Sequence, residues 1–350
     1  MTVSHNKNKK HINAKYILIV IAFLLVVTII LWLLQCLLVP KYMSLVPEGA
    51  LIAEYYSDTG KHDVIFIGDC EVYENFSPIT LWEQYGITSY IRGSAQQLIW
   101  QSYYLLEEIF KYETPEVVVF NVLSMKYGEP QNEAYNRLNI DGMKLSSSKI
   151  ECIKASMTEE EDLITYIFPI LRYHARWSEL SYEDFEYMFR RDRIGHSGYL
   201  MQTDVRPVES FPIMPPLADP FFSEVCWSYL DRIRLICEEN NAELVLIKAP
   251  SLYPHWYTEW EEQIEDYSDK YGIRYYNLLE AVDEIGIDWS RDTYDKGLHL
   301  NVYGAEKLSD YFGNILASEI GVRDRRDSDE DVKIWQKKCD IYYREKENNQ

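Results

Sequence analysis

The chain has 350 residues, of which 47% are hydrophobic and 26% are charged, proportions typical of a globular protein rather than a disordered one. It carries 35 basic and 56 acidic residues, for a formal net charge of -21. The first fifteen residues contain four lysines and no acid, so the rest of the chain has 31 basic against 56 acidic residues. This acidity excludes binding to nucleic acid phosphates, and it excludes general attraction to anionic lipid outside the basic N-terminus.

Residues 16–40 contain no charged side chain and are mostly Ile, Leu and Val. A helix of about 24 residues is ~36 Å long, enough to cross a hydrocarbon core of about 30 Å with some tilt. A cleaved signal peptide predicts a shorter apolar region ending in small residues, whereas this one ends in Gln35, Cys36 and two leucines. We therefore expect an uncleaved signal anchor at 16–40, with a cytoplasmic tail at 1–15 and the remaining chain outside the plasma membrane.

After a linker at 41–62, short apolar runs alternate with helical patterns. Five runs have the character of buried strands, at 63–68, 89–93, 116–121, 243–248 and 274–277. The first two end in Gly. Helices are expected at 96–112, 221–240, 256–271 and 303–320. This alternation predicts a three-layer α/β/α sandwich with a parallel sheet, in a domain at 63–320.

The third and fourth strands are separated by more than 120 residues, too many for a single crossover. The sequence therefore predicts an inserted, mostly helical cap at about 125–220, with helices at 146–157, 159–173 and 182–191. A Pro-rich stretch at 207–220 is expected to close the cap without regular structure.

The charged tail at 321–350 contains a helical pattern. Ser328, with Asp331 three residues on, resembles a capping box, and Trp335, Cys339 and Tyr342 fall on one helical stripe. We expect a C-terminal helix that packs on the domain.

The six cysteines show no CxxC spacing, so neither a zinc site nor a dense disulfide framework is indicated. Five of them follow the apolar span, and an odd number leaves at least one thiol unpaired. The sequence allows a Cys152–Cys237 or a Cys226–Cys339 disulfide bond. No cluster of His and carboxylate residues has metal-ligand spacing, and no cofactor motif is present.

Polar residues that can do chemistry follow the predicted strands. Ligands of an open parallel sheet bind at the carboxyl ends of its strands, where Cys70, Gly93 and a loop with Asp295 and His299 are expected. A nucleophile on a sharp strand-to-helix turn is exposed, and its backbone N–H faces the reacting carbonyl oxygen. His299 would accept the proton of the Cys70 thiol, and a carboxylate would fix the tautomer of the imidazole.

These segments resemble a known family, the SGNH (GDSL-type) hydrolases. The stretch 64–78, with Gly68-Asp69-Cys70, resembles the first block of the family, Arg92-Gly93-Ser94 the second, and 295–307 the last. The similarity is greatest to a membrane-anchored branch in Gram-positive bacteria, which includes the D-alanyl transfer protein of teichoic acid assembly and polysaccharide O-acetyltransferase ectodomains. The resemblance covers about 60–320 apart from the cap, and it implies a flavodoxin-like fold.

The resemblance implies that Cys70 is the nucleophile, His299 the base and Asp295 the orienting acid, with the backbone N–H of Gly93 in an oxyanion hole. The chain departs from the family in three ways. Cys70 replaces a Ser, and Asp295 precedes His299 by four residues rather than three, so Asp292 is a second candidate. The Gly-x-Asn-Asp block is absent, and the nearest substitute for its Asn is Asn121 at the end of the third strand.

Three further residues are candidates for substrate contact. Glu71 either faces the pocket or begins a solvated helix. His174 and Arg176 in the cap, beside Trp177, either bind a glycan or an anionic acyl carrier or pack the cap on the sheet, and we favour packing.

These patterns predict an exoplasmic acyltransferase or esterase that acts on a cell-envelope glycan or teichoic-acid-like polyol polymer without a cofactor or metal. The resemblance also implies an acyl donor delivered by a membrane-bound O-acyltransferase partner. The alternative is a catalytically inactive accessory or glycan-binding protein that keeps the fold.

Overall fold

The computed structural model describes residues 14–40, 50–190, 195–217 and 219–349. Its centre is a sheet of five parallel strands in the order β2-β1-β3-β4-β5. The strands are β1 (Val64–Gly68), β2 (Ser89–Gly93), β3 (Val117–Asn121), β4 (Glu243–Lys248) and β5 (Arg274–Asn277). This is a common order of doubly wound α/β sheets, in which the strand order reverses between β1 and β3. The predicted parallel sheet is confirmed.

The apolar runs explain why both faces of the sheet are covered. In β1, Val64 and Phe66 enter one core cluster, whereas Ile65 and Ile67 enter the other. Because successive strand side chains point to opposite faces, a continuous apolar run needs helices on both sides. The ends of β1 and β2 are level, since Gly68 is paired with Gly93 in the register.

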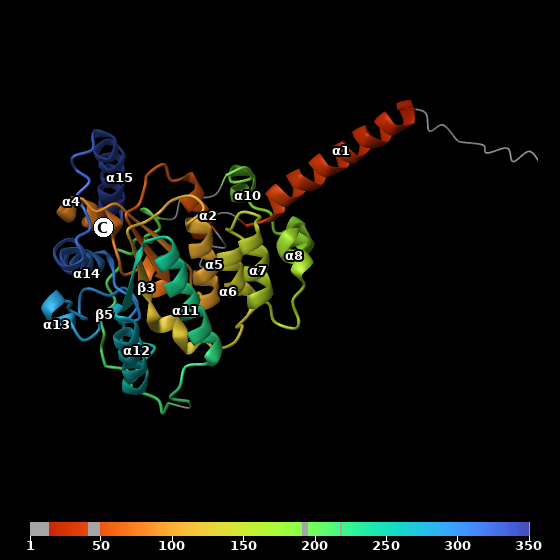
Figure 1. Ribbon diagram of the computed structural model, residues 1–350. Helices are drawn as coiled ribbons and strands as arrows, with labels where there is room; N and C mark the ends of the chain where they lie inside the picture. Colours follow the sequence, from red (N-terminus) through yellow and green to blue (C-terminus); the bar gives the residue numbers. More distant parts are fainter. Residues whose placement is uncertain (1–13, 41–49, 191–194, 218, 350) are drawn as a thin grey trace, which may run out of the picture.

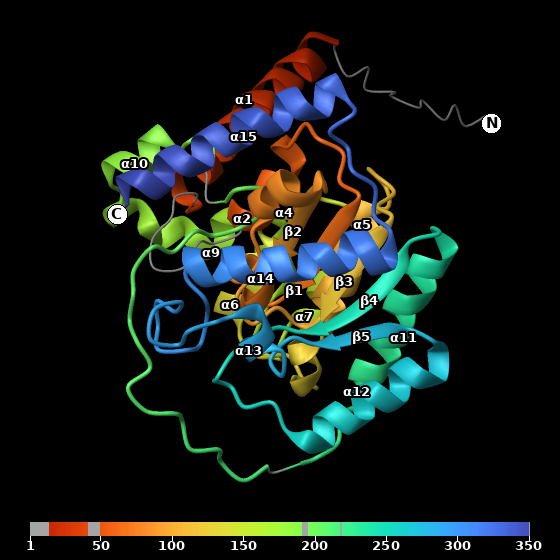
Figure 2. The same ribbon diagram turned by 90° about the vertical axis from the view of Figure 1, so that its left-hand side faces the viewer.

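Helices form a layer on each face of the sheet (Figures 1 and 2). The layer on one face contains α4 (Pro78–Tyr85) and α14 (Val302–Ile315), followed by the π-helical turn η4 (Leu316–Ile320). The layer on the other face contains α5 (Ile99–Ile109), α11 (Glu224–Glu239) and α12 (Thr258–Tyr271). The short α3 (Cys70–Tyr73) and α13 (Val282–Ile285) lie in loops that join strands to these helices.

The segment predicted as a cap begins with three helical elements, η2 (Val122–Lys126), α6 (Glu133–Ile140) and α7 (Ser147–Ser156). Helix α7 packs along α5, and α6 packs on α7 and on α2 (Ala50–Glu54). Apolar residues of this region belong to the same core cluster as α5 and α11. These helices therefore widen one helical layer instead of forming a separate lid.

The helix predicted at 159–173 is divided. The structure has α8 (Leu163–Ile167) and α9 (Ile170–Tyr173), followed by η3 (His174–Ser178) and α10 (Tyr182–Glu186). The break falls at Pro169, which has no N–H to donate to the preceding turn. The predicted helix at 182–191 is shorter than expected, and its last residue lies outside the described part of the chain. The Pro-rich stretch 207–220 has no regular structure at its described residues, as predicted.

The N-terminal apolar helix is α1 (Ala14–Leu38), which is 25 residues long and apolar enough to cross a membrane. It projects away from the domain (Figure 1). The expected linker at 41–62 is partly folded, because α2 and η1 (Tyr55–Ser57) pack against the domain through Ala50, Leu51 and Ile52. Residues 41–49 lie outside the described residues.

The C-terminal helix is confirmed as α15 (Asp329–Asn348). The Ser328 hydroxyl accepts a hydrogen bond from the Asp331 N–H at 3.3 Å, which caps its first turn. Trp335, Cys339 and Tyr342 are buried on one side of it, and the ring of Trp335 stacks on Trp82 at 5.4 Å between centroids. All six cysteines are free thiols. A Cys226–Cys339 bond is also ruled out by position, because the two residues lie in core clusters on opposite faces of the sheet.

Candidate active site

Cys70 begins α3 at the carboxyl end of β1, next to the point where the strand order reverses. The Asp69 carboxylate accepts a hydrogen bond from the Glu71 N–H at 3.2 Å and so caps the short helix. A Cβ atom on Gly93 would lie 2.8 Å from Val72 Cγ2 and 3.0 Å from the Gly68 carbonyl oxygen. Glycine is therefore required where the end of β2 approaches the Cys70 turn.

His299 lies on the loop before α14 and is only 6% exposed. Its Nδ1 atom is 2.7 Å from Asp295 Oδ2, and its backbone N–H donates to Asp295 Oδ1 at 2.8 Å. One carboxylate thus fixes both the backbone and the ring of the same residue. A proton on Nδ1 donates to Asp295 and leaves the lone pair of Nε2 as the basic site. Nε2 is buried and has no hydrogen-bond partner among the described residues.

The geometry distinguishes between the two candidate acids. Asp292 is held elsewhere, because its Oδ2 accepts from Lys307 Nζ at 2.5 Å and from the Asp288 N–H at 2.8 Å. The structure therefore brings Asp295, and not Asp292, to the imidazole of His299.

A second carboxylate that the sequence did not indicate also faces His299. Glu74 Oε2 lies 3.3 Å from His299 Nδ1 and accepts a hydrogen bond from the Tyr294 hydroxyl. That hydroxyl is itself 3.5 Å from Nδ1. The only signal in the sequence is the spacing of Cys70 and Glu74, which are four residues apart at the start of a helix and so share a face.

The electrostatics of the site couple the ionisation of the imidazole to that of the thiol. Burial disfavours the charged form of His299, but the charge of Cys70, then Glu74, and the hydrogen bond to Asp295 together raise its pKa well above the ordinary value. Burial also raises the pKa of the Cys70 thiol, and the imidazole of His299 partly lowers it. The two groups thus lie close enough to change each other's ionisation, as in cysteine–histidine pairs that act as nucleophiles.

A buried polar network lies behind the Cys70 turn. Glu71 is 1% exposed and forms an ion pair with Lys248, whose Nζ atom lies 2.9 Å from Glu71 Oε1. The Ser251 hydroxyl donates to the same carboxylate at 2.5 Å. Asn121 donates to Glu71 at 2.9 Å and to Asp69 at 3.1 Å, and its oxygen accepts from the Ala249 N–H. Glu71 therefore does not begin a solvated helix, and the Asn121 amide is already engaged within the protein.

Lys126, at the end of η2, places a cation next to this network. Its ammonium group lies over the ring of Tyr127, 4.7 Å from the centroid. The pKa of Lys126 is lowered on balance, because burial outweighs the opposite effect of the neighbouring Asp69, Glu71 and Cys70. The position suits an anionic group on a substrate bound beside Cys70.

His174 and Arg176 lie at the end of α1. Arg176 donates to the Leu38 carbonyl at 2.5 Å and to Asp184 at 2.9 Å, and His174 Nδ1 is 2.8 Å from the Leu171 carbonyl. Arg176 therefore packs against the end of α1 and not on the sheet, whereas His174 is exposed and its ring contacts the preceding turn.

Glu74, Asp295 and His299 each place one potential ligand atom within 4.8 Å of the others, close enough to hold a metal ion. The spacing in the sequence did not indicate this group, because Glu74 is distant from the other two. In the structure the three side chains are joined by short contacts through Nδ1 and by the Tyr294 hydroxyl. The same contacts are also those that orient a basic imidazole.

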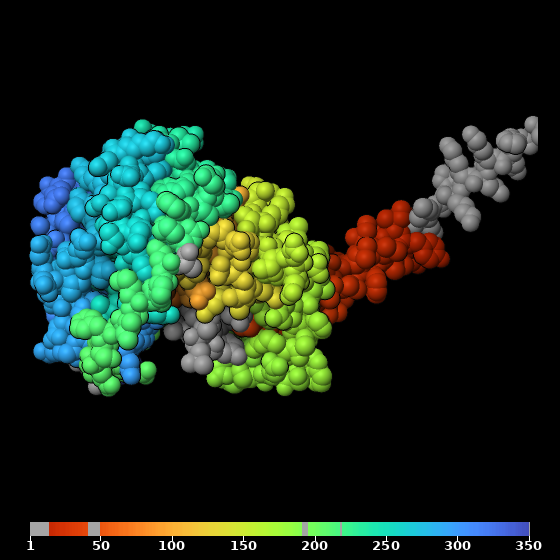
Figure 3. Space-filling model, turned by 90° about the horizontal axis from the view of Figure 1, so that it is seen from below, coloured from red at the N-terminus to blue at the C-terminus, as the bar shows by residue number. Residues whose placement is uncertain are grey.

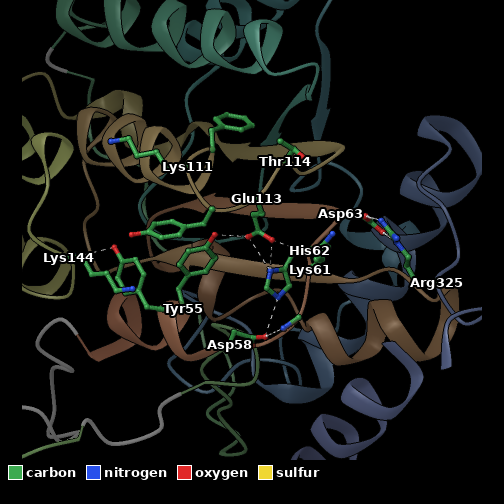
Figure 4. Close-up of a pocket in the computed structure, with 14 residues that line it drawn as sticks. Tyr55, Asp58, Lys61, His62, Asp63, Lys111, Glu113, Thr114, Lys144 and Arg325 are labelled. Carbon is green, nitrogen blue, oxygen red and sulfur yellow. Dashed lines mark hydrogen bonds and ion pairs between the residues drawn. The ribbon is translucent and has the colours of Figure 1, made fainter. Parts of the chain in front are cut away.

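A cavity of about 600 Å³ lies at the other edge of the sheet, beside the amino ends of β1 and β3 (Figure 4). His62 lies between Asp58 and Glu113 in it, 3.6 Å and 3.1 Å from their carboxylates. Arg325 is paired with Asp63. Each of these three carboxylates is already paired with a basic side chain, Asp58 also with Lys338. We therefore place the candidate active site at Cys70 and not in this cavity.

Comparison with models of known protein families and with curated protein sequences finds no match for this chain. Its function is therefore inferred from the chemistry of the Cys70 site and from the resemblance of its motifs.

Proposed function

We propose that this chain is a membrane-anchored SGNH-like acyltransferase or esterase that acts on hydroxyl groups of a cell-envelope glycan or teichoic-acid-like polymer. The observation that carries the proposal is the placement of Cys70 beside His299 and Asp295 at the carboxyl edge of the sheet. α1 is the proposed membrane span, with the α/β domain on the exoplasmic side.

The proposed reaction has two steps. The Cys70 sulfur attacks the carbonyl carbon of the acyl donor, and the thiol proton passes to His299 Nε2. The tetrahedral intermediate then expels the donor's leaving group, which takes that proton, and a thioester remains on Cys70. In the second step His299 removes a proton from an acceptor hydroxyl, whose oxygen attacks the thioester. The thiol leaves and recovers its proton, and water in place of the hydroxyl gives hydrolysis.

Several features support the assignment of roles. The backbone N–H groups of Cys70 and Gly93 are the proposed oxyanion donors, because Gly93 ends β2 and is paired with Gly68, two residues before Cys70. Lys126 adds a cation for an anionic carrier or phosphate-bearing acceptor. A membrane-bound O-acyltransferase that delivers the acyl donor is the proposed partner, on the resemblance of the motifs alone.

The test is acylation of the full chain in detergent micelles by 4-nitrophenyl acetate, read as acetyl mass on the Cys70 peptide. We expect no adduct in Cys70→Ala, and a rate reduced about 100-fold or more in His299→Ala because the general base is lost. Cys36→Ser and His174→Ala are the matched controls and should behave as the parent chain. Full acylation of His299→Ala would contradict the mechanism.

A second function is a non-catalytic accessory or glycan-binding protein. The observation in its favour is the burial that raises the pKa of the Cys70 thiol and so disfavours the thiolate. The absence of Cys70 acylation by any of a panel of aryl esters, together with retained polymer binding in Cys70→Ala, would support this second function.

A further inference from the structure

An apolar surface is exposed on α8, α9, η3 and α10, at the base of α1. Seven large side chains of this segment are between 48% and 77% exposed, although all seven are aromatic or branched aliphatic residues that soluble proteins usually bury in part. They are Ile164, Phe168, Leu171, Trp177, Tyr182, Phe185 and Phe189. We call these seven residues the α8–α10 surface.

The α8–α10 surface is continuous with the last turns of α1. The ring of Phe189 lies 6.0 Å from that of Trp32, and the Ile170 N–H donates to Gln35 Oε1 at 3.5 Å. Arg176 binds the terminal carbonyl of the helix at Leu38. Figure 3 shows the yellow-green part of the chain against the base of the red helix α1. The contacts hold this surface beside α1.

The length of α1 gives the position of these contacts relative to a membrane that the helix would cross. At 1.5 Å per residue, the 25 residues of α1 span ~37 Å, against a hydrocarbon core of about 30 Å. Trp32 precedes the end of the helix by six residues, which corresponds to ~9 Å along its axis. The helix exceeds the core by ~7 Å in all, so, if α1 crosses the membrane as proposed above, Trp32 lies a few ångström inside the hydrocarbon edge. A side chain that touches Trp32 is then next to the headgroup region.

The composition of the surface matches that depth. Trp and Tyr are enriched at membrane interfaces because each ring is apolar but carries a polar N–H or O–H, and Phe and Leu form the buried face of interfacial helices. Exposed charges on the same segment have both signs, with Arg172 and Arg190 against Glu179, Glu183 and Glu186. Apolar burial, and not attraction to anionic lipid, is therefore the driving force for contact.

We infer that the α8–α10 surface inserts into the headgroup region of the leaflet that faces the domain. The inference rests on the proposed span of α1. It gives the domain two attachments to the membrane, one through the helix and one through the surface. The domain then has a defined tilt instead of swinging on a tether.

Photo-crosslinking in the full chain tests this insertion. p-Benzoylphenylalanine replaces Phe189, and in separate variants Phe185, in protein reconstituted into phosphatidylcholine vesicles. Phe211 is the matched control, because it is the same residue type with the same 69% exposure but lies in the extended stretch of the chain. Phe23 in α1 reports on the span itself.

We expect lipid adducts at 189 and 185 in a yield about 10-fold above that at 211, unchanged when phosphatidylglycerol is added. A lipid adduct at 23 without one at 189 or 185 would overturn the inference and leave the anchor intact. The absence of an adduct at 23 would refute the span and, with it, the inference. In cells, a protein adduct at 189 in place of lipid would assign the surface to a protein partner and overturn the inference.

Discussion

At the scale of single residues, the site depends on how His299 is held. Asp295 binds its ring and its backbone N–H, and Glu74 adds a second negative charge at Nδ1. Although burial lowers it, the pKa of the imidazole is raised by the charge of an ionised Cys70, then by Glu74 and the hydrogen bond to Asp295, so the ring is suited to take the thiol proton. The imidazole in turn lowers the pKa of a thiol that burial raises.

The pH dependence of Cys70 alkylation tests this coupling. We expect iodoacetamide to modify the Cys70 peptide with a midpoint above the ordinary thiol value of about 8.5, since burial raises the pKa. Because the imidazole lowers that pKa, His299→Gln should move the midpoint to still higher pH. His174→Ala should leave it in place. A midpoint that falls, or stays constant, in His299→Gln would contradict the coupling.

At the scale of elements, α3 is joined to β4 by a buried ion pair and to β3 by a hydrogen bond from Asn121. Glu71 of α3 is paired with Lys248 of β4, and both side chains are at most 1% exposed. Removing one partner of a buried pair leaves an uncompensated charge, which costs far more than losing an exposed pair. The network therefore holds the Cys70 turn against the carboxyl ends of the strands.

Substitution of Lys248 measures this anchoring. We expect Lys248→Met to lower the free energy of unfolding by about 3–5 kcal/mol, because Glu71 is left buried and unpaired. The double variant Glu71→Gln/Lys248→Met should recover part of that loss. Lys154→Met breaks an exposed ion pair with Glu151 and should cost at most about 1 kcal/mol. Thermal unfolding in detergent, followed by circular dichroism, gives the comparison, and equal losses for the two lysine variants would refute the role of the buried pair.

At the scale of the whole molecule, the net charge has opposite signs on the two sides of α1. The four lysines of residues 1–15 precede the apolar stretch, and a domain with an excess of acidic residues follows it. A net charge of -21 makes electrostatic capture of an anionic wall polymer unfavourable for the domain as a whole. An envelope substrate therefore has to be recognised by local contacts, and Lys126 is one cation available beside Cys70.

Protease digestion of intact cells tests the orientation. We expect a C-terminal epitope tag to be removed by external protease, whereas an N-terminal tag is protected. Replacing the four lysines of residues 1–15 by Gln should reduce the fraction with this orientation, because the positive-inside signal is lost. Lys333→Gln/Lys337→Gln, which removes exposed positive charges far from the span, should have no effect. A protected C-terminal tag in the parent chain would contradict the exoplasmic placement.

Local patterns were sufficient for most of the secondary structure. β2, β4 and β5 have the predicted bounds, and the apolar stripe of Trp335, Cys339 and Tyr342 is the buried side of α15. Periodicity reports which face of an element is buried, and it is carried by neighbouring residues. Pro169, by contrast, divides a segment that the periodicity had joined into one helix.

The apolar helix, the parallel sheet and the segments that follow its strands could be predicted from the sequence alone, because each depends on residues that are close together in the chain. Only the tertiary structure shows that Glu74 and Tyr294 lie next to His299. It also shows that Asp295, and not Asp292, binds the imidazole, and that Glu71 pairs with Lys248. It further shows that Arg176 packs against the end of α1 and not on the sheet. These outcomes depend on distances between residues up to about two hundred positions apart, which are set by how the layers pack and not by local spacing.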